Sequence, residues 1–574
     1  MKTLNLHCDY IKFKALKKAL KSVDEIAPNQ KLEGESKECL VVMVAVEKGD
    51  SKETIPELVD SIKKIAEDVK TKNIVLYPYA HLSSNLGKPG TAVEVLNETA
   101  KKLKGFKVVQ APFGYYKSFE LKVKGHPLSE LSREFVVKGN EVEEAELSKE
   151  ERAQMLRKLS KVKMQAPRGK NDLKSNVELG RDLDLYIVNE IVGPGLPLLT
   201  PKGATIKREI ERFTTDEELK RGYEYTSTPI MAKSDLFKIS GHWQHYKKDM
   251  FVLNIEGDDY ALRPMTCPFQ FVLYKRKPRT YKDLPKKYAE IATLYRKEQS
   301  GELRGLTRLW QFTLADGHII CTPEQLEEEF GKVMDLINYI IKTFGIEVWY
   351  RFSKWGPDNK NNKYVDNPKA WEATQKSMKK ILDNAKINYV EADDEAAFYG
   401  PKLDLQYKDV YGKEDTLITI QIDFALPEKF GLTYLAEDGK EKEAMVIHRS
   451  STGATERIIA YLLEKTQGNL PLWLSPIQAR IMTMNDDVKD YGKEIKNKLM
   501  ESGIRVELDN SNESIGKKAR NAIVDKVFYL VTVGEKEKSG GKIAVRGRAS
   551  KEITTMDLDE FISKLKEEIS SKTL

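Results

Sequence analysis

The chain has 574 residues, 40% of them hydrophobic and 32% charged, with a net charge of +7. Its length predicts three or four domains of about 150 residues each. The small positive charge permits an RNA partner but does not require one. No apolar run approaches the ~18 residues of a membrane span, and Met1–Lys21 lacks the apolar core of a signal peptide. Four scattered cysteines are too few for a disulfide framework, so we expect a reducing cytoplasm.

Residues 1–137 are predicted to form a compact α/β domain. Ile55–Val69 carries apolar residues at helical spacing. Short apolar runs rich in β-branched residues predict strands at Cys39–Val46, Asn73–Pro78, Phe106–Ala111 and Tyr115–Val123.

Residues 138–176 are rich in Glu, Lys and Arg and are predicted to be an exposed, partly helical linker. A large mixed α+β segment, 177–467, follows, and residues 468–574 have a βαβ-like pattern. In this last segment the predicted strands and helices are Ala479–Met484, Lys489–Ser502, Ser514–Val524 and Lys526–Val533.

Three distant residues, Cys267, His318 and His448, each lie in a short distinctive stretch. One thiolate and two imidazoles are a complete set for a zinc ion that keeps positions open for substrate. The gaps of 51 and 130 residues are too long for spacing alone to establish such a site. Taken singly, each of the three is more often a packed core residue than a ligand.

A second group of residues suits ATP. Two strands joined by the polar loop Gln299–Thr307 would place four side chains on one surface, with Arg for phosphate, Glu for the adenine amino group and Phe to stack on the base. These residues are Arg296, Glu298, Arg308 and Phe312. The alternative is a surface hairpin with salt bridges. Further along, Arg457 begins an apolar helix and could clamp the far phosphate.

These two segments resemble motifs 2 and 3 of class II aminoacyl-tRNA synthetases, and Gly222–Pro229 resembles motif 1. The resemblance implies an antiparallel sheet ringed by helices, a homodimer through motif 1, and attack of an amino-acid carboxylate on ATP with Mg²⁺ bridging the phosphates. It assigns Arg296 to the α-phosphate and substrate carboxylate and Arg457 to the γ-phosphate.

Within that class, five segments resemble threonyl-tRNA synthetases: Arg263–Pro268, Asp316–Ile319, Ala397–Asp404, Gln421–Phe424 and Ile447–Arg449. The resemblance implies that zinc on Cys267, His318 and His448 binds the amine and hydroxyl of threonine. A site built for a hydroxyl rejects valine, which lacks it, by ~10⁴ or more. The resemblance also implies that Asp316 and Tyr399 hydrogen-bond the bound hydroxyl and amine. Lys402 and Gln421 would line the pocket for ATP and threonine, and Lys402 is a further catalytic candidate.

Serine also has a hydroxyl and differs from threonine by one methyl, worth only ~1–3 kcal/mol, so a hydrolytic checkpoint is expected. Tyr79–Ser84, Pro112–Lys117 and Gly125–Leu131 resemble the editing domain of archaeal threonyl-tRNA synthetases, which is itself similar to D-aminoacyl-tRNA deacylases. The resemblance implies that Lys117 activates the ester and water. It places His81, Tyr116 and Glu130 around that lysine, and for His126 we expect only a structural role.

Residues 468–574 resemble the anticodon-binding domain of several class II synthetases. Asn512, Glu537 and Arg546 match positions that read anticodon bases in relatives. Splayed single-stranded bases suit polar side chains on loops and strand ends.

Together these resemblances imply a multidomain α/β and α+β protein with threonine–tRNA ligase activity and with tRNA(Thr), ATP and threonine as partners. The composition leads us to expect a cytoplasmic location and no membrane. The rival interpretations are a class II ligase for serine or proline, a non-catalytic tRNA-binding paralogue, and a ligase whose editing domain is inactive.

Overall fold

A computed structural model describes residues 1–19, 32–83, 85–135, 149–159, 164, 166–356 and 363–572. They divide into two compact units, Met1–Glu150 and Glu151–Leu574. Among the described residues, none of the helices combines the length and the apolar composition needed to cross a bilayer.

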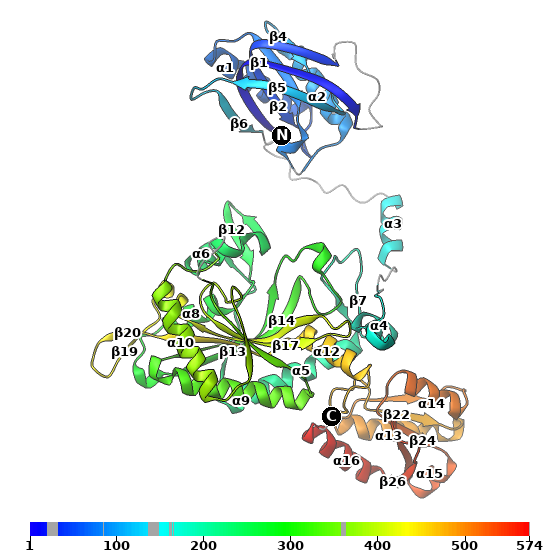
Figure 1. Ribbon diagram of the computed structural model, residues 1–574. Helices are drawn as coiled ribbons and strands as arrows, with labels where there is room; N and C mark the ends of the chain where they lie inside the picture. The colour runs from blue at the N-terminus through cyan, green and yellow to red at the C-terminus, as the bar shows by residue number, and fades with distance from the viewer. Residues whose placement is uncertain are drawn as a thin grey trace. The chain divides into compact units, whose positions relative to one another are not determined.

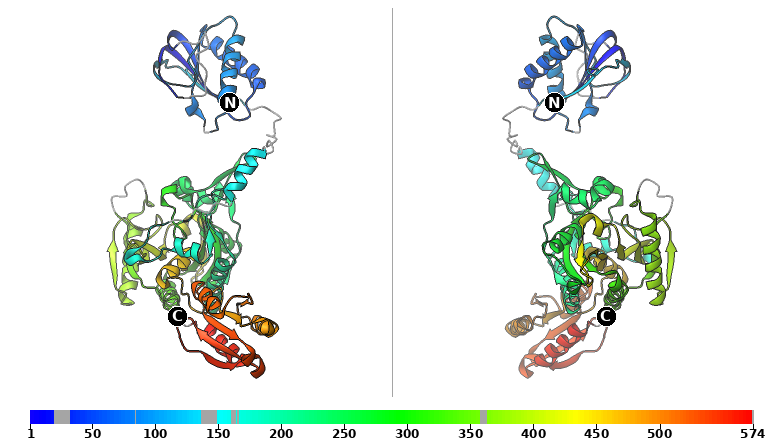
Figure 2. Two further views of the ribbon diagram at one scale, coloured as in Figure 1. Left: turned by 90° about the vertical axis from the view of Figure 1, so that its right-hand side faces the viewer. Right: turned by 90° about the vertical axis from the view of Figure 1, so that its left-hand side faces the viewer.

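The first unit contains a β-sheet, drawn in blue in Figure 1. Among the described residues this sheet has six strands with the order β4-β3-β2-β1-β5, and β6 also pairs with β1. Its elements are β1 (Lys2–Lys18), β2 (Glu33–Ala45), α1 (Ile55–Asp68), β3 (Asn73–Pro78), α2 (Pro89–Lys102), β4 (Lys107–Gln110), β5 (Tyr115–Val123) and β6 (Glu130–Glu134). Both helices pack on one face of the sheet, where Val42 of β2, Leu58 of α1 and Val95 of α2 share a core (Figure 2).

The four strands and the first helix predicted for this unit are confirmed. The prediction missed the 17-residue strand β1, whose exposed Lys12 and Lys14 alternate with the buried Ile11 and Phe13. An alternating strand with one polar face has no continuous apolar run, so a search for such runs passes over it.

The second unit contains an eight-stranded sheet within the described residues, with the order β16-β15-β17-β18-β21-β14-β13-β9 (Figure 1). Its strands are antiparallel except at the edges, where β9 pairs with β13 and β16 pairs with β15 in parallel. This agrees with the predicted antiparallel sheet ringed by helices. The strands are β9 (Glu224–Tyr225), β13 (Lys286–Tyr295), β14 (Gln311–Cys321), β15 (Trp349–Ser353), β16 (Tyr389–Ala392), β17 (Lys402–Lys408), β18 (Glu414–Asp423) and β21 (Met445–Ala454).

The helices of this part are α3 (Lys149–Leu159), α4 (Asn176–Asp182), α5 (Pro201–Lys220), α6 (Ser234–Ile239), α7 (His242–Tyr246), α8 (Cys267–Lys275), α9 (Leu326–Phe344), α10 (Pro368–Asn384), α11 (Leu426–Phe430) and α12 (Thr455–Thr466). Smaller strands pair as β7 (Tyr186–Ile187) with β8 (Leu198–Leu199), β10 (Met231–Lys233) and β11 (Val252–Ile255) with β12 (Asp258–Leu262), and β19 (Thr433–Leu435) with β20 (Glu441–Glu443).

Strand alternation gives the large sheet two different faces. On β14, Ile319 and Cys321 join a core that includes residues of α5, α9 and α12. Asp316 and His318, on the same strand, line a cavity. Because successive side chains of a strand point to opposite faces, one strand supplies both the core and the site.

The C-terminal part is a five-stranded sheet with the order β23-β22-β24-β25-β26. Its elements are β22 (Ala479–Thr483), α13 (Lys489–Glu501), β23 (Val506–Asp509), α14 (Ile515–Val524), β24 (Tyr529–Val533), α15 (Glu535–Gly540), β25 (Lys542–Gly547), β26 (Thr554–Asp557) and α16 (Leu558–Ser571). The strands and helices predicted for this segment are confirmed. β22 lies parallel to both β23 and β24, and helices connect these strands along the chain.

The predicted linker lies partly outside the described residues, which omit 136–148, 160–163 and 165. Ser84 of the first domain also lies outside them. The helical part is confirmed as α3. The end of the predicted linker is already packed on the second unit, where Lys170 N donates to Val410 O at 2.8 Å and Tyr411 Oη donates to Pro167 O at 2.9 Å.

Candidate functional site

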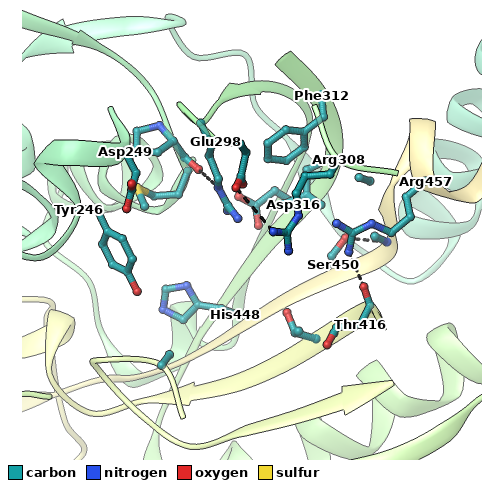
Figure 3. Close-up of a pocket in the computed structure, with 18 of the residues that line it drawn as sticks. Tyr246, Asp249, Glu298, Arg308, Phe312, Asp316, Thr416, His448, Ser450 and Arg457 are labelled. Carbon is teal, nitrogen blue, oxygen red and sulfur yellow. Dashed lines mark hydrogen bonds and ion pairs between the residues drawn. The ribbon is translucent and has the colours of Figure 1, made fainter. Parts of the chain in front are cut away.

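A cavity of about 760 Å³ lies over the polar face of the eight-stranded sheet. Its lining residues lie on β14, β18 and β21, on the segment that follows β13, and on the segments that lead into α8 and β17. These parts lie far apart in the sequence, and Figure 3 shows some of the residues that they contribute. The cavity is lined by every residue that the sequence assigned to zinc, threonine or ATP: Cys267, Arg296, Glu298, Arg308, Phe312, Asp316, His318, Tyr399, Lys402, Gln421, His448 and Arg457.

Cys267, His318 and His448 meet at the base of this cavity. Each offers one ligand atom, and these atoms all lie within 4.8 Å of one another. His318 on β14 is the register partner of His448 on β21, and Cys267 is the first residue of α8. The antiparallel register therefore brings together two histidines that are 130 residues apart in the sequence.

The hydrogen bonds of the two imidazoles define which ring atoms face a metal. Nε2 of His448 lies 2.7 Å from Oδ2 of Asp423, and Nδ1 of His318 lies 2.6 Å from Oε1 of Gln270. Each acceptor holds a proton on the nitrogen beside it, which leaves Nδ1 of His448 and Nε2 of His318 as the ligand atoms. Burial lowers the pKa of His318 well below its usual value, so this imidazole is neutral, as a ligand must be.

The thiol of Cys267 completes the set. Burial and the nearby carboxylates of Asp316 and Asp423 raise its pKa well above the usual value, so without a cation the thiol stays protonated. A bound cation would reverse this preference. One sulfur and two imidazole nitrogens in a buried cluster therefore fit Zn²⁺ with open coordination positions.

Tyr399 and Asp316 flank the cluster. The Tyr399 ring stacks on His448 with centroids 4.8 Å apart, and its hydroxyl donates to Oε1 of Gln421 at 2.5 Å. Asp316 accepts a hydrogen bond from the backbone N–H of Thr266 at 3.3 Å. Both side chains are held beside the metal-ligand cluster, where they can contact a small ligand bound there.

Cationic side chains line another part of the cavity. Arg296 lies over the Phe312 ring, 5.2 Å from its centroid, and Arg457 donates to Thr307 O at 3.1 Å and to Thr416 O. Arg308 lies 3.9 Å from Glu298 (Figure 3), whose pKa is raised by burial. The expected placement of these side chains on one surface agrees with the structure, since Arg296, Glu298, Arg308 and Phe312 all line the same cavity.

The sequence reasoning missed some lining residues. His242 is fully buried at the cavity wall, its Nδ1 lies 2.7 Å from Ser240 Oγ, and burial lowers its pKa to about 3. Tyr246 also lines the cavity. The signal available in the sequence was the polar and aromatic run Gly241–Tyr246, which precedes α8.

In the first unit, Lys117 lies on β5 against an aromatic cluster. Its Nζ donates to Pro112 O at 3.0 Å and lies 4.9 Å from the Tyr77 ring centroid. Burial lowers its pKa to about 8. Tyr79 joins this cluster to His81, with ring centroids 5.5 Å apart, whereas Tyr116 is 65% exposed.

Glu130 does not lie beside Lys117, and the expected grouping is corrected on this point. Lys117 pairs with Ala15 and Glu130 pairs with Leu6, both on β1. These positions are nine residues apart on β1, or roughly 30 Å of strand at 3.3 Å per residue. Sequence resemblance could not reveal this because it carries no strand register.

His126, which was expected to have a structural role, pairs with His7: its Nε2 lies 2.8 Å from Nδ1 of His7.

In the C-terminal part, Asn512 follows β23 and Glu537 follows β24, so both lie at the carboxyl edge of the parallel strands. Oε2 of Glu537 accepts a hydrogen bond from Gly534 N at 2.9 Å. Arg546 lies on β25 opposite Leu530, closer to the start of β24.

Three family models match successive parts of the chain. Residues 1–135 match an Archaea-specific editing domain of threonyl-tRNA synthetase, residues 250–466 match a class II tRNA synthetase core domain (G, H, P, S and T), and residues 478–568 match an anticodon-binding domain. With the antiparallel sheet and the arginine-lined cavity already described, they define the chain as a class II aminoacyl-tRNA synthetase.

Individual relatives narrow this class. The chain is 52% identical over 400 residues to threonine–tRNA ligases of Clostridium perfringens and Clostridium botulinum, covering 69% of this chain and 62% of theirs. A solved structure described as the RNA-binding domain of threonyl-tRNA synthetase from Cryptosporidium parvum is 32% identical with a TM-score of 0.66, covering 69% of this chain and 98% of that one. A putative threonyl-tRNA synthetase from Aeropyrum pernix is 26% identical with a TM-score of 0.59, covering 70% of this chain and 97% of that one.

The chain belongs to the threonyl-tRNA synthetase family, and its first 135 residues match the editing domain of the archaeal type. It spans 62% of the length of the curated relatives that it matches.

Proposed function

We propose that this chain is a threonine–tRNA ligase, which activates threonine with ATP and transfers it to tRNA(Thr). The observation that carries the proposal is the cluster of Cys267, His318 and His448 within the same cavity as Arg296 and Arg457. A metal-ligand set beside two cationic side chains suits a hydroxylated amino acid next to a triphosphate.

The nucleotide would occupy the cationic side. Arg296 would neutralise the α-phosphate and orient the threonine carboxylate, and Arg457 would hold the γ-phosphate, with Mg²⁺ bridging the phosphates. Glu298 and Phe312 would hold adenine, and Arg308 and Gln421 would complete the ATP pocket. In-line displacement depends on such positioning and charge neutralisation more than on covalent catalysis.

The amino acid would occupy the metal side. Cys267, His318 and His448 would hold Zn²⁺, which when bound would coordinate the amine and hydroxyl of threonine and so exclude valine. Asp316 and Tyr399 would accept hydrogen bonds from these two groups. Lys402, whose Nζ is held 3.0 Å from Oδ2 of Asp404, would place a positive charge between the two substrates.

The first unit would remove serine from mischarged tRNA(Thr). Lys117, with its lowered pKa, would activate the ester and water, supported by His81 and Tyr116. Glu130 is not part of this proposed site, because the registers of β5 and β6 on β1 hold it far from Lys117.

The remaining assignments rest on resemblance. Asn512, Glu537 and Arg546 would read anticodon bases, and the motif 1 segment Gly222–Pro229 would form a homodimer interface. The proposed boundaries are 1–137 for editing, 138–176 for the linker, 177–467 for catalysis and 468–574 for anticodon binding. A cytoplasmic location stays a prediction from the sequence.

Amino-acid-dependent exchange of pyrophosphate into ATP tests the ligase directly. We expect strong exchange with threonine, weaker exchange with serine, and almost none with valine or proline. Strong exchange with serine or proline instead would keep the class and overturn the specificity. The complete absence of exchange with zinc and ATP present would favour the non-catalytic paralogue.

A further inference from the structure

A chain of hydrogen bonds, buried at its start and partly buried further on, runs from the candidate metal-ligand cluster to the motif 1 segment. Nδ1 of His318 and Oε1 of Gln270 are 2.6 Å apart, and Nε2 of Gln270 donates to Oγ1 of Thr226 at 2.8 Å. The Thr226 hydroxyl lies 3.0 Å from Oε2 of Glu290 and 3.3 Å from Ala289 O. Gln270 has no exposed surface and only 5% of Glu290 is exposed.

The acceptors at the end of this hydrogen-bond chain determine which group donates at each of its steps. A carboxylate and a peptide carbonyl can only accept, so the Thr226 hydroxyl donates to one of them and keeps a lone pair for the amide N–H of Gln270. The amide of Gln270 is therefore oriented with its oxygen toward His318, which must supply the proton from Nδ1. The opposite ring atom of His318, Nε2, is left unprotonated and able to bind a metal.

Glu290 is itself anchored. Its Oε1 lies 2.8 Å from Nη1 of Arg263, and it accepts hydrogen bonds from both the backbone N–H and the hydroxyl of Thr228. Arg263 also donates from Nε to Thr293 O at 2.9 Å. The carboxylate at the end of the chain thus joins β13 to the segment Thr226–Thr228, which follows β9.

We propose that Gln270 and Thr226 are positioning residues: their one-way hydrogen-bond chain holds His318 in the tautomer that binds the metal and couples metal affinity to the seating of the motif 1 segment. The inference rests on the proposed metal site. Because such coupling is reciprocal, occupancy of the metal site in turn stabilises the segment Thr226–Thr228.

Metal affinity of the full chain, measured by competition of Zn²⁺ with a chromophoric chelator, tests the proposal. Gln270→Leu removes the acceptor while keeping the volume, and we expect affinity to fall about 10–100-fold. Gln270→Glu restores an acceptor to Nδ1 and should recover most of this loss. Thr226→Val should cost about 2–10-fold, the value of one hydrogen bond.

A double-mutant cycle separates the chain from general destabilisation. When Thr226→Val is added to the Gln270→Leu variant, it should have no further effect on metal affinity, because its path to His318 is already cut. Thr228→Val is the matched control, since it removes a hydroxyl that lies off the path while the backbone N–H of residue 228 still donates to Glu290 and keeps the segment in place, so its metal affinity should equal that of wild type. The absorption spectrum of the Co²⁺-loaded protein should change in the Gln270→Leu variant and be restored in Gln270→Glu.

Two results would overturn the inference alone: wild-type metal affinity in Gln270→Leu, or an undiminished effect of Thr226→Val when it is combined with Gln270→Leu. A wild-type chain that binds neither Zn²⁺ nor Co²⁺ would overturn the metal site of the proposed function as well. The two failures are therefore distinguishable in one set of titrations.

Discussion

The guanidinium of Arg449 and the carboxylate of Glu218 form an ion pair at 2.6 Å with no exposed surface on either side chain. The pair joins β21, which carries His448, to α5, the helix before the motif 1 segment. Tyr225 Oη and Ser451 Oγ each donate to the Glu218 carboxylate at 2.5 Å, and the guanidinium carbon lies 4.2 Å from the Tyr223 ring centroid. The strand that carries His448, a proposed metal ligand, is thus held to a neighbouring helix by a buried ion pair.

Glu218→Ala should destabilise the second unit by about 3–5 kcal/mol, because it leaves the Arg449 charge buried without its partner. Chemical denaturation followed by tryptophan fluorescence would measure the change. The control is Asp235→Ala, which breaks the exposed pair with Lys238 and should alter stability by less than about 0.5 kcal/mol. Equal effects of the two substitutions would contradict the assigned role of the buried pair.

Cys267→Ser should abolish stoichiometric zinc and reduce threonine-dependent exchange, because a serine hydroxyl is a poor ligand compared with a thiolate. Metal analysis of the purified protein gives the answer. Cys321→Ser is a matched control, since Cys321 is equally buried on β14 but belongs to the hydrophobic core. Retention of one zinc per chain in Cys267→Ser would remove Cys267 from the ligand set.

The lowered pKa of Lys117, about 8, predicts a pH dependence for seryl-tRNA hydrolysis. Below pH 8 the side chain is an ammonium that can polarise the ester carbonyl, and above pH 8 it is a neutral amine that cannot. The enzymatic rate, corrected for spontaneous hydrolysis, should therefore fall as the pH rises through about 8. A rate that rises through pH 8 would instead assign the neutral amine as a base.

The same experiment needs two variants. Lys117→Met should hydrolyse seryl-tRNA slowly and without the inflection near pH 8. Lys122→Met is the control, since Lys122 lies on the same strand, is exposed and pairs with Asp9 at 3.0 Å. Hydrolysis by Lys117→Met at the wild-type rate would rule out the editing role of this lysine.

Two neighbouring arginines on or after β25 should behave differently. Arg546→Ala should weaken tRNA binding by about 1–3 kcal/mol with an unchanged melting temperature, as expected for a base contact. Arg548→Ala should lower the melting temperature, because Arg548 donates to the backbone carbonyls of Asn469, Leu470 and Lys526. A melting curve and a tRNA titration for each variant would distinguish a tRNA contact from a structural role. Normal tRNA binding with a lower melting temperature in Arg546→Ala, and the reverse in Arg548→Ala, would contradict both assignments.

Elements with a clear local pattern could be predicted from the sequence. The apolar run Asn73–Pro78 is strand β3 with the same limits, and Ile55–Val69 corresponds to α1 within one residue. The strand β1 was missed because its lysines interrupt the apolar pattern, although its inward-facing residues are buried. Local composition identifies a strand where it forms an apolar run or alternates regularly, and β1 alternates over only part of its length.

The sequence by itself determined the residue types and flanking motifs of the site, including Cys267, His318, His448, Arg296 and Arg457, and with them the family. Only the tertiary structure decided which of these side chains meet. The antiparallel register of β14 and β21 brings His318 opposite His448, whereas the register of β1 holds Glu130 away from Lys117. The orientations of the imidazoles likewise depend on Gln270 and Asp423, since hydrogen-bond partners are chosen by distance in space and not by order along the chain.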